Sequence, residues 1–292
     1  MTKRRCEKSP KVGRTGEDVG EGLQRYPCHP EFRICKTLEI VLPDRLRRIV
    51  SQLREAGGEF WRRPFIKERA FNIEAEALLA SGIEENDQLT TYLGKLNDLY
   101  QLFIRQTRPS PAPVMTAGPL FRWLWAGRPN RYQSHGNFKL KDVIDAQMSR
   151  GDRAVGNCLG LTLLYHCLLR RMGVRADGLY LENGFGKGPH VLTILDTGET
   201  SIDVENIFQN GFDYKGHLSD PSRTRWGDRE LVADIYHSLA NELLEEGRFA
   251  LALKSYEKAI ALNPHYEKAH LNRAILLDRM EMEKERPRKG RV

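Results

Sequence analysis

A cysteine, a histidine and an aspartate lie within residues 155–206, in an order that could support thiol chemistry: Cys158, His190 and Asp203. A thiol with the reference pKa of about 8.5 is mostly protonated at neutral pH, so a nucleophilic cysteine needs a helix N-terminus or an imidazolium beside it. A histidine can take the thiol proton and return it to the leaving group, and a carboxylate can fix the histidine tautomer. These residue types predict attack on an amide carbonyl and a thioester on Cys158.

The sequence around Cys158 predicts the first turn of a helix. Residues 159–172 are an apolar run long enough for about four turns, with apolar side chains at three- and four-residue steps: Leu161, Leu164, Leu168 and Met172. Asn157 is a preferred N-cap residue, and Gly173 lies where such a helix would end. The free N–H groups and the helix dipole at this end favour a thiolate, and the Cys158 N–H would be one oxyanion donor.

Three strands are expected after this helix. Alternating apolar residues predict strands over 176–182, 190–195 and 200–205, with a turn at residues 196–199. A two-residue hairpin turn would put His190 opposite Glu205, with Asp203 as its diagonal neighbour. A bulge or a longer turn would bring Asp203 beside His190. The sequence therefore leaves open which carboxylate meets the histidine.

The same residues resemble a known family. Asn157-Cys158 at a helix start, His190-Val191-Leu192 at a strand start and Ile202-Asp203-Val204 at a strand end are similar to the transglutaminase-like superfamily, over roughly residues 140–208. This resemblance implies a papain-type core in which Cys158 is the nucleophile, His190 the base and Asp203 the residue that orients the imidazole. Many members carry a small residue and then a tryptophan after the histidine, whereas Val191 and Leu192 follow here. Trp123 and Trp125 are candidates for the upstream oxyanion donor.

The C-terminal part has a helical period and resembles one tetratricopeptide repeat over residues 233–266. Ala240 and Leu243 recur one repeat length later as Ala274 and Leu277, so a second repeat begins. About three repeats are usually needed for stability alone. We therefore expect this part to pack on the catalytic core or on another chain. Asn241 and Asn272 could face a groove and bind a peptide backbone or carboxylate; the alternative is a helical buttress.

The whole pattern predicts an α+β fold, with a transglutaminase-like core in which the nucleophile helix packs on an antiparallel sheet. The expected organisation is a basic, disordered tail (1–36), a helical region (37–113), the transglutaminase-like domain (114–222), tetratricopeptide-like helices (228–280) and a charged tail (281–292).

Composition limits the class of protein. The chain has 292 residues, a formal net charge of +7 and five cysteines. The cysteines form no disulfide-dense pattern, and we find no leader or membrane span, so we expect a cytoplasmic protein with reduced thiols. Cys28, His29 and Cys35 could be three metal ligands, but no fourth is spaced to complete a zinc site, so no metal or cofactor is expected. Much of the positive charge lies in the tails, so we do not expect a nucleic-acid partner.

Two hypotheses follow. The first is an enzyme, a cysteine hydrolase or acyltransferase that cuts or transfers an amide on a protein or peptide substrate through Cys158, His190 and Asp203. The second is a degenerate transglutaminase-like fold that acts as a protein-binding module through its helical repeat. Neither hypothesis involves a membrane.

Overall fold

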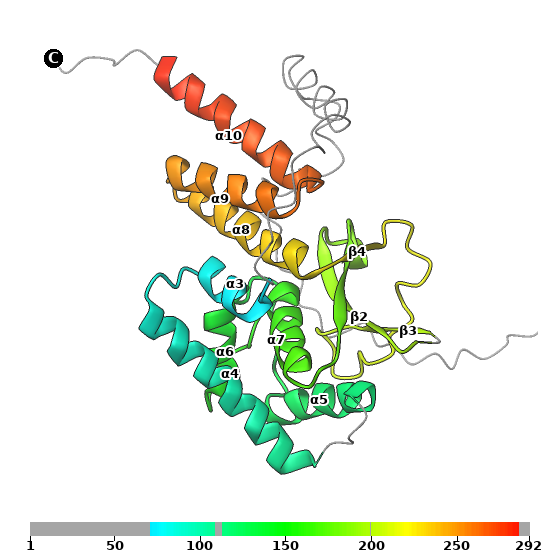
Figure 1. The fold of residues 1–292 in the computed structure, drawn as a ribbon. Helices are drawn as coiled ribbons and strands as arrows, with labels where there is room; N and C mark the ends of the chain where they lie inside the picture. The colour runs from blue at the N-terminus through cyan, green and yellow to red at the C-terminus, as the bar shows by residue number, and fades with distance from the viewer. Residues whose placement is uncertain (1–70, 109–112, 199, 286–292) are drawn as a thin grey trace, which may run out of the picture. The chain divides into compact units, whose positions relative to one another are not determined.

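The structure is a computed structural model that describes residues 71–108, 113–198 and 200–285 (Figure 1). The predicted tail of residues 1–36, with Cys28, His29 and Cys35, lies outside the described residues. So do the first part of the predicted helical region and residues 286–292 of the predicted charged tail. Helices and one small antiparallel sheet make up the described part.

From residue 71 onward, where the structure describes the chain, four helices precede the cysteine: α3 (Ile73–Ala80), α4 (Asn86–Thr107), α5 (Pro113–Gly127) and α6 (Leu140–Met148). Helix α3 begins at a side-chain cap, because Asn72 accepts hydrogen bonds from two backbone N–H groups in the first turn. Helix α4 buries one apolar stripe, Leu96, Leu99 and Phe103. These helices pack on one another and, through α3, α4 and α6, on the helix that carries Cys158.

Helix α7 (Cys158–Arg171) is the centre of the fold. Every side chain from Leu159 to Leu169 is buried, so this helix is surrounded by other elements on all sides. It ends before Gly173, whose φ of +72° is the left-handed conformation that glycine adopts most easily after a helix. The predicted helix is therefore present, and Cys158 is its first residue.

The sheet lies against α7 and has the order β3-β2-β1-β4, with every neighbouring pair antiparallel. Its strands are β1 (Ala176–Leu181), β2 (His190–Asp196), β3 (Ser201–Val204) and β4 (Thr224–Trp226). The turn η2 (Gly184–Gly186) joins β1 to β2. The first three strands were predicted from the sequence, whereas β4 was not.

The hairpin between β2 and β3 has a longer turn than two residues. Asp196 pairs with Ser201, and Ile194 pairs with Asp203. Relative to the two-residue turn, the register moves by two positions, so the same faces of the strands stay together but the partners change. The longer turn does not bring Asp203 beside His190; it places Asp203 opposite Ile194.

Three further helices end the described chain: α8 (Asp228–Glu245), α9 (Phe249–Leu262) and α10 (Glu267–Glu285). Helix α8 packs on α9, and α10 packs on α9, around a small apolar cluster (Ala240, Leu243, Ala252, Tyr256 and Leu276). Helix α8 also contacts α3, α7, β1 and β4, and Figure 1 shows it beside α3 and α7. The salt bridge from Lys139 to Glu242 (2.7 Å) and that from Arg170 to Asp228 (2.7 Å) join the repeat to the preceding helices.

No helix among the described residues combines the length and apolar character that crossing a membrane requires.

Candidate functional site

The N-terminus of α7 holds Cys158 in a defined place. The Asn157 side chain accepts a hydrogen bond from the Gly160 N–H (3.0 Å), and the Asn157 N–H donates to the Asn137 carbonyl (3.0 Å). A side chain at Gly160 would clash with that same Asn137 carbonyl, so glycine is needed for the close approach. Cys158 is a free cysteine and is partly exposed as a residue.

His190, the first residue of β2, is buried and links the thiol to a carboxylate. Its Nε2 lies 2.8 Å from Oε2 of Glu205. Burial alone would lower the pKa of His190, but hydrogen bonds with Cys158 and Glu205 and the charges of both raise this pKa to about 10. Because Glu205 occupies Nε2, the nitrogen left for Cys158 is Nδ1. Because the pKa of His190 lies well above 7, its ring is an imidazolium at neutral pH.

Glu205 follows β3 directly and is completely buried. Burial acts to raise the pKa of its carboxyl group, but hydrogen bonds with His190 and His217 lower the pKa below the usual range. The Ile207 N–H adds a longer contact with Oε1 at 3.4 Å. The carboxylate is therefore ionised at neutral pH and faces the imidazolium.

Asp203 has a different partner from the one predicted for it. Its carboxylate binds the Arg223 guanidinium through two hydrogen bonds, of 2.6 and 3.0 Å. Arg223 also donates to the His217 carbonyl (3.0 Å), so this pair fixes the loop that carries His217. The hydrogen-bond partner of His190 is Glu205, which corrects the assignment of Asp203 to the imidazole. The physical reason is the register of the hairpin, which carries Asp203 toward Ile194.

His217 is a residue that the sequence does not single out. It is buried, and its Nε2 lies 3.4 Å from the same Oε2 of Glu205 that meets His190. The two imidazole nitrogens and the carboxylate oxygen lie within 4.8 Å of one another, which is close enough to hold a metal ion. A single histidine in a loop carries no sequence signal of this kind.

Tyr132 is a second residue that the sequence misses. Burial, followed by the charges of Cys158 and Glu205, raises the pKa of its phenol to about 12. The hydroxyl group therefore keeps its proton at neutral pH and lies close enough to feel both charges. Of the two candidates suggested by the sequence, the Trp123 indole N–H donates to Gln106 (2.7 Å), so it is engaged elsewhere. The Trp125 ring packs on Arg131, and its indole N–H is buried without a hydrogen bond to any of the described residues.

An aromatic side chain covers the two histidines. Phe185 lies with its ring centroid 5.3 Å from that of His190 and 4.5 Å from that of His217. It is 40% exposed and has a φ of +54°, a backbone conformation that is uncommon for a bulky residue. Its neighbour Gly184 packs directly against the His190 side chain. The outer boundary of the site is therefore apolar.

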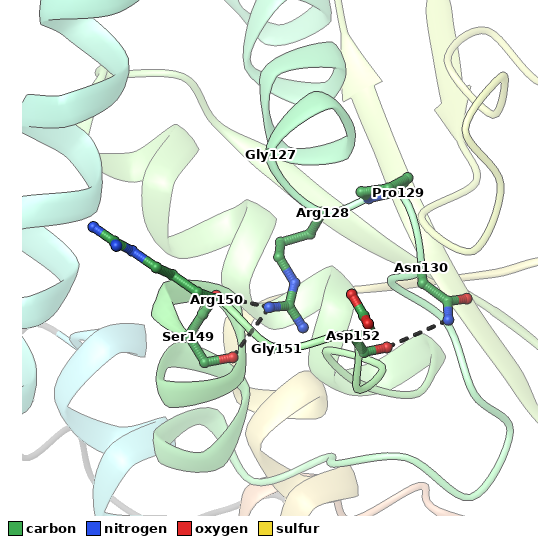
Figure 2. Close-up of a pocket in the computed structure, with 8 residues that line it drawn as sticks. All are labelled: Gly127, Arg128, Pro129, Asn130, Ser149, Arg150, Gly151 and Asp152. Carbon is green, nitrogen blue, oxygen red and sulfur yellow. Dashed lines mark hydrogen bonds between the residues drawn. The ribbon is translucent and has the colours of Figure 1, made fainter.

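A separate pocket of about 310 Å³ lies between the end of α5 and the end of α6 (Figure 2). Its lining residues are Gly127, Arg128, Pro129, Asn130, Ser149, Arg150, Gly151 and Asp152. Arg128 donates to the carbonyl (2.7 Å) and the hydroxyl (3.1 Å) of Ser149, and Figure 2 shows this contact across the pocket. The lining contains neither a thiol nor an imidazole, so this pocket is not the candidate centre.

The asparagines expected to face a peptide groove are bonded to other side chains of the repeat. The Asn272 amide donates to Asn241 Oδ1 (3.0 Å), and the Tyr256 hydroxyl donates to the same oxygen (2.6 Å). Asn272 also contacts His237 (3.1 Å), and His237 contacts the Tyr266 hydroxyl (3.1 Å). A peptide could bind these amides only by replacing these contacts.

Comparison with known proteins supports one of the two resemblances. Residues 233–266, which include most of α8 and all of α9, match the tetratricopeptide repeat family. The comparisons with curated proteins and with solved structures give no match. The resemblance to the transglutaminase-like superfamily therefore stays a prediction. The C-terminal helices contain a tetratricopeptide repeat, and this repeat suggests a protein-binding role.

Proposed function

We propose that the protein carries out cysteine-dependent amide chemistry, as a hydrolase or an acyltransferase, with Cys158 as nucleophile, His190 as base and acid, and Glu205 as the residue that orients the imidazole. One observation carries this proposal: at the N-terminus of a buried helix, the Glu205 carboxylate lies 2.8 Å from Nε2 of His190, and Cys158 and Glu205 together raise the pKa of this histidine to about 10. Asp203 is replaced in this role by Glu205.

The chemistry follows from the charges of the site. The imidazolium of His190 and the helix N-terminus stabilise the Cys158 thiolate, which attacks an amide carbonyl and forms a tetrahedral intermediate. The imidazolium proton then goes to the leaving amine, the C–N bond breaks and a thioester remains. Water or an amine, deprotonated by His190, then attacks the thioester and the C–S bond breaks. The carboxylic acid or the new amide leaves, and the Cys158 thiolate and His190 imidazolium are restored.

Glu205 keeps the ring in the required tautomer. Its carboxylate holds Nε2–H, so Nδ1 stays directed at the sulfur throughout. The oxyanion would form near the Cys158 N–H, and the Tyr132 hydroxyl, still protonated at neutral pH, is the second donor we propose. Loss of one oxyanion donor typically lowers the rate by about 100- to 1000-fold.

The test is the rate of Cys158 alkylation by iodoacetamide between pH 5 and 9, measured by mass spectrometry of the modified peptide. At pH 6 an ordinary thiol is less than about 1% thiolate, so a Cys158 thiolate should react roughly 100-fold faster than a free thiol. The variant His190→Ala should lose this advantage. The proposal would be refuted if the alkylation rate rose only near pH 8.5 and were the same in the unchanged chain and in His190→Ala.

A second candidate function is protein binding without catalysis, favoured by the match to the tetratricopeptide repeat. Two large apolar side chains of the repeat helices are exposed, Leu251 on α9 (44%) and Met282 on α10 (61%). Leu251→Glu and Met282→Glu should abolish capture of a partner by the full chain if the repeat binds it. Met115→Glu, at an exposed position on α5, is the matched control. Capture that also requires Cys158 would count against a role of the repeat alone.

A further inference from the structure

We propose that His190, Glu205 and His217 form a binding site for a divalent transition-metal cation, best represented by Zn²⁺. The site shares His190 and Glu205 with the proposed thiol chemistry but does not include Cys158, so binding of the cation can be measured apart from the reactivity of the thiol. It takes the two imidazole Nε2 atoms and the Glu205 Oε2 atom, which come from the start of β2, the end of β3 and the loop before β4.

The three ligand atoms already lie near the spacing that a cation needs. Oε2 of Glu205 is 2.8 Å from Nε2 of His190 and 3.4 Å from Nε2 of His217. In a tetrahedral zinc site with bonds of about 2.0–2.1 Å, ligand atoms lie roughly 3.3 Å apart. The Glu205–His217 pair therefore has this separation, the Glu205–His190 pair must open by about half an ångström, and the ligand atoms of the two histidines lie within 4.8 Å of each other.

Nε2 of the second histidine lies in the cluster with only a loose contact, 3.4 Å from Oε2 of Glu205. His217 is 5% exposed, and its Nε2 is buried without a well-directed hydrogen bond to any of the described residues. A buried polar atom without a partner costs free energy, and an atom in this state calls for a water or an ion. A cation between the rings would satisfy this nitrogen and the Glu205 carboxylate together.

The donor types select the class of cation. Two neutral imidazoles and one carboxylate suit Zn²⁺, whereas Mg²⁺ and Ca²⁺ prefer oxygen ligands throughout. Three protein ligands leave a fourth position for water. On binding, the cation takes the Nε2 lone pair of His190, and the proton that this atom carries in the imidazolium leaves to solvent.

Neighbouring residues hold these ligand side chains in position. The His217 carbonyl is held by Arg223, which is itself fixed by two hydrogen bonds to Asp203. Fixed outer contacts of this kind orient metal-binding histidines. Nδ1 of His190 does not take part in its contact with Glu205 and stays free of the proposed cation. A cation would enter beside Phe185, the exposed ring over both histidines.

The experiment titrates ZnCl₂ into the full chain after treatment with a chelator, with calorimetry as the readout. All proteins carry Cys28→Ser and Cys35→Ser, because these two thiols outside the described residues are alternative ligands. We expect one Zn²⁺ per chain. His217→Gln and Glu205→Gln should each weaken binding by more than about 100-fold, since loss of even an outer contact typically costs 10- to 100-fold.

The matched control is His135→Gln, which removes an exposed histidine and should leave the affinity unchanged. A chain that binds no Zn²⁺, or that binds it equally in all these variants, overturns the proposal. Because a substitution in the cluster could unfold the protein, circular dichroism is recorded for each variant.

A second measurement uses the chain without any change in the cluster. In nitrogen NMR of the histidines, Zn²⁺ should shift the Nε2 signals of His190 and His217 and leave that of His135 in place. Shifts confined to other histidines would refute the site even if every variant unfolded. Alkylation of Cys158 in the cation-free chain tests the thiol chemistry separately, so either proposal can fail alone.

Discussion

The middle of α7 and its N-terminal end each place a cysteine near a histidine, but only at the end is the histidine hydrogen-bonded to a carboxylate. In the middle, burial and the charge of Arg170 lower the pKa of His166 to about 3, and burial raises the pKa of the Cys167 thiol. The only side-chain hydrogen bond of His166 among the described residues is with Thr193 (3.1 Å). Both groups are therefore neutral at pH 7.

At the end of the helix, the histidine carries a charge. His190 is also buried, yet its pKa rises to about 10 because Cys158 and Glu205 offset the cost of burial. The comparison teaches that the partners of a buried histidine, and not its burial, decide its charge. A cysteine and a histidine in contact with one helix are not sufficient for a reactive pair; an ionised carboxylate on the far side of the ring is the difference.

The largest expected effect is in the reactivity of the two thiols. Cys167 is completely buried, so a reagent can reach it only when the protein opens. With an ordinary unfolding free energy, its alkylation should be at least about 1000-fold slower in the folded chain than in denaturant. Cys158 should react in the folded chain. The variants Cys158→Ala and Cys167→Ala show which cysteine is modified, because each lacks one of the two thiols. Equal alkylation rates at both positions in the folded chain would contradict the difference between the two sites.

The next effect concerns the two carboxylates that flank Val204. Glu205→Gln removes the charge that faces His190 and should slow alkylation of Cys158 at pH 6 by roughly 10- to 100-fold. Asp203→Asn should leave this rate within a factor of about three while it loosens Arg223 and lowers stability. Histidine NMR provides the matching observation, because only Glu205→Gln should move the His190 titration to lower pH.

The two histidines should also change stability with pH in opposite directions. The folded pKa of His166 lies below the unfolded value, so the unfolded chain binds an extra proton and stability falls by about 2 kcal/mol between pH 6.5 and 5. In His166→Gln this loss should disappear from urea unfolding curves. The folded pKa of His190 is raised, so its contribution is complete below pH 6.5 and is lost as pH rises toward 10. If the stability of His166→Gln still fell between pH 6.5 and 5 by as much as that of the unchanged chain, the assignment of this loss to His166 would be contradicted.

The smallest effect is at the cap of α7. Asn157→Ala removes the side-chain acceptor for the Gly160 N–H and should cost about 1 kcal/mol of stability. The change should lower Cys158 reactivity only a few-fold, because His190 and Glu205 remain. A loss as large as that of Glu205→Gln would mean that the helix end, and not the imidazole, activates the thiol.

Local patterns allowed the main elements to be predicted. Helix α7, its cap at Asn157 and the first three strands follow from apolar spacing and from preferred end residues. The repeat at residues 233–266 also has a period that the sequence shows directly. These features depend on neighbours in the chain, which is why a single sequence contains them.

The details of the candidate site depend on contacts between distant residues. The length of the turn between β2 and β3 decides which carboxylate meets His190, and the sequence did not predict this length. Asp203 pairs with Arg223, which follows a loop whose sequence has no recognisable pattern. Tyr132 and His217 reach the site from loops on either side of it. No regular spacing in the sequence connects these residues to Cys158. The sequence could therefore indicate the cysteine and the histidine of the candidate site, but not all the residues that form it.

The loop between Glu205 and Arg223 has a further consequence for the kinetics of binding. It contains no helix or strand of its own, and a segment of this length would ordinarily have many conformations to lose when a ligand arrives. Here the Asp203–Arg223 contact closes its ends, and the Glu205 N–H bonds to the Gly211 carbonyl (2.8 Å). Its conformational entropy is thus given up during folding. A ligand that meets His217 should therefore associate without waiting for the loop to order.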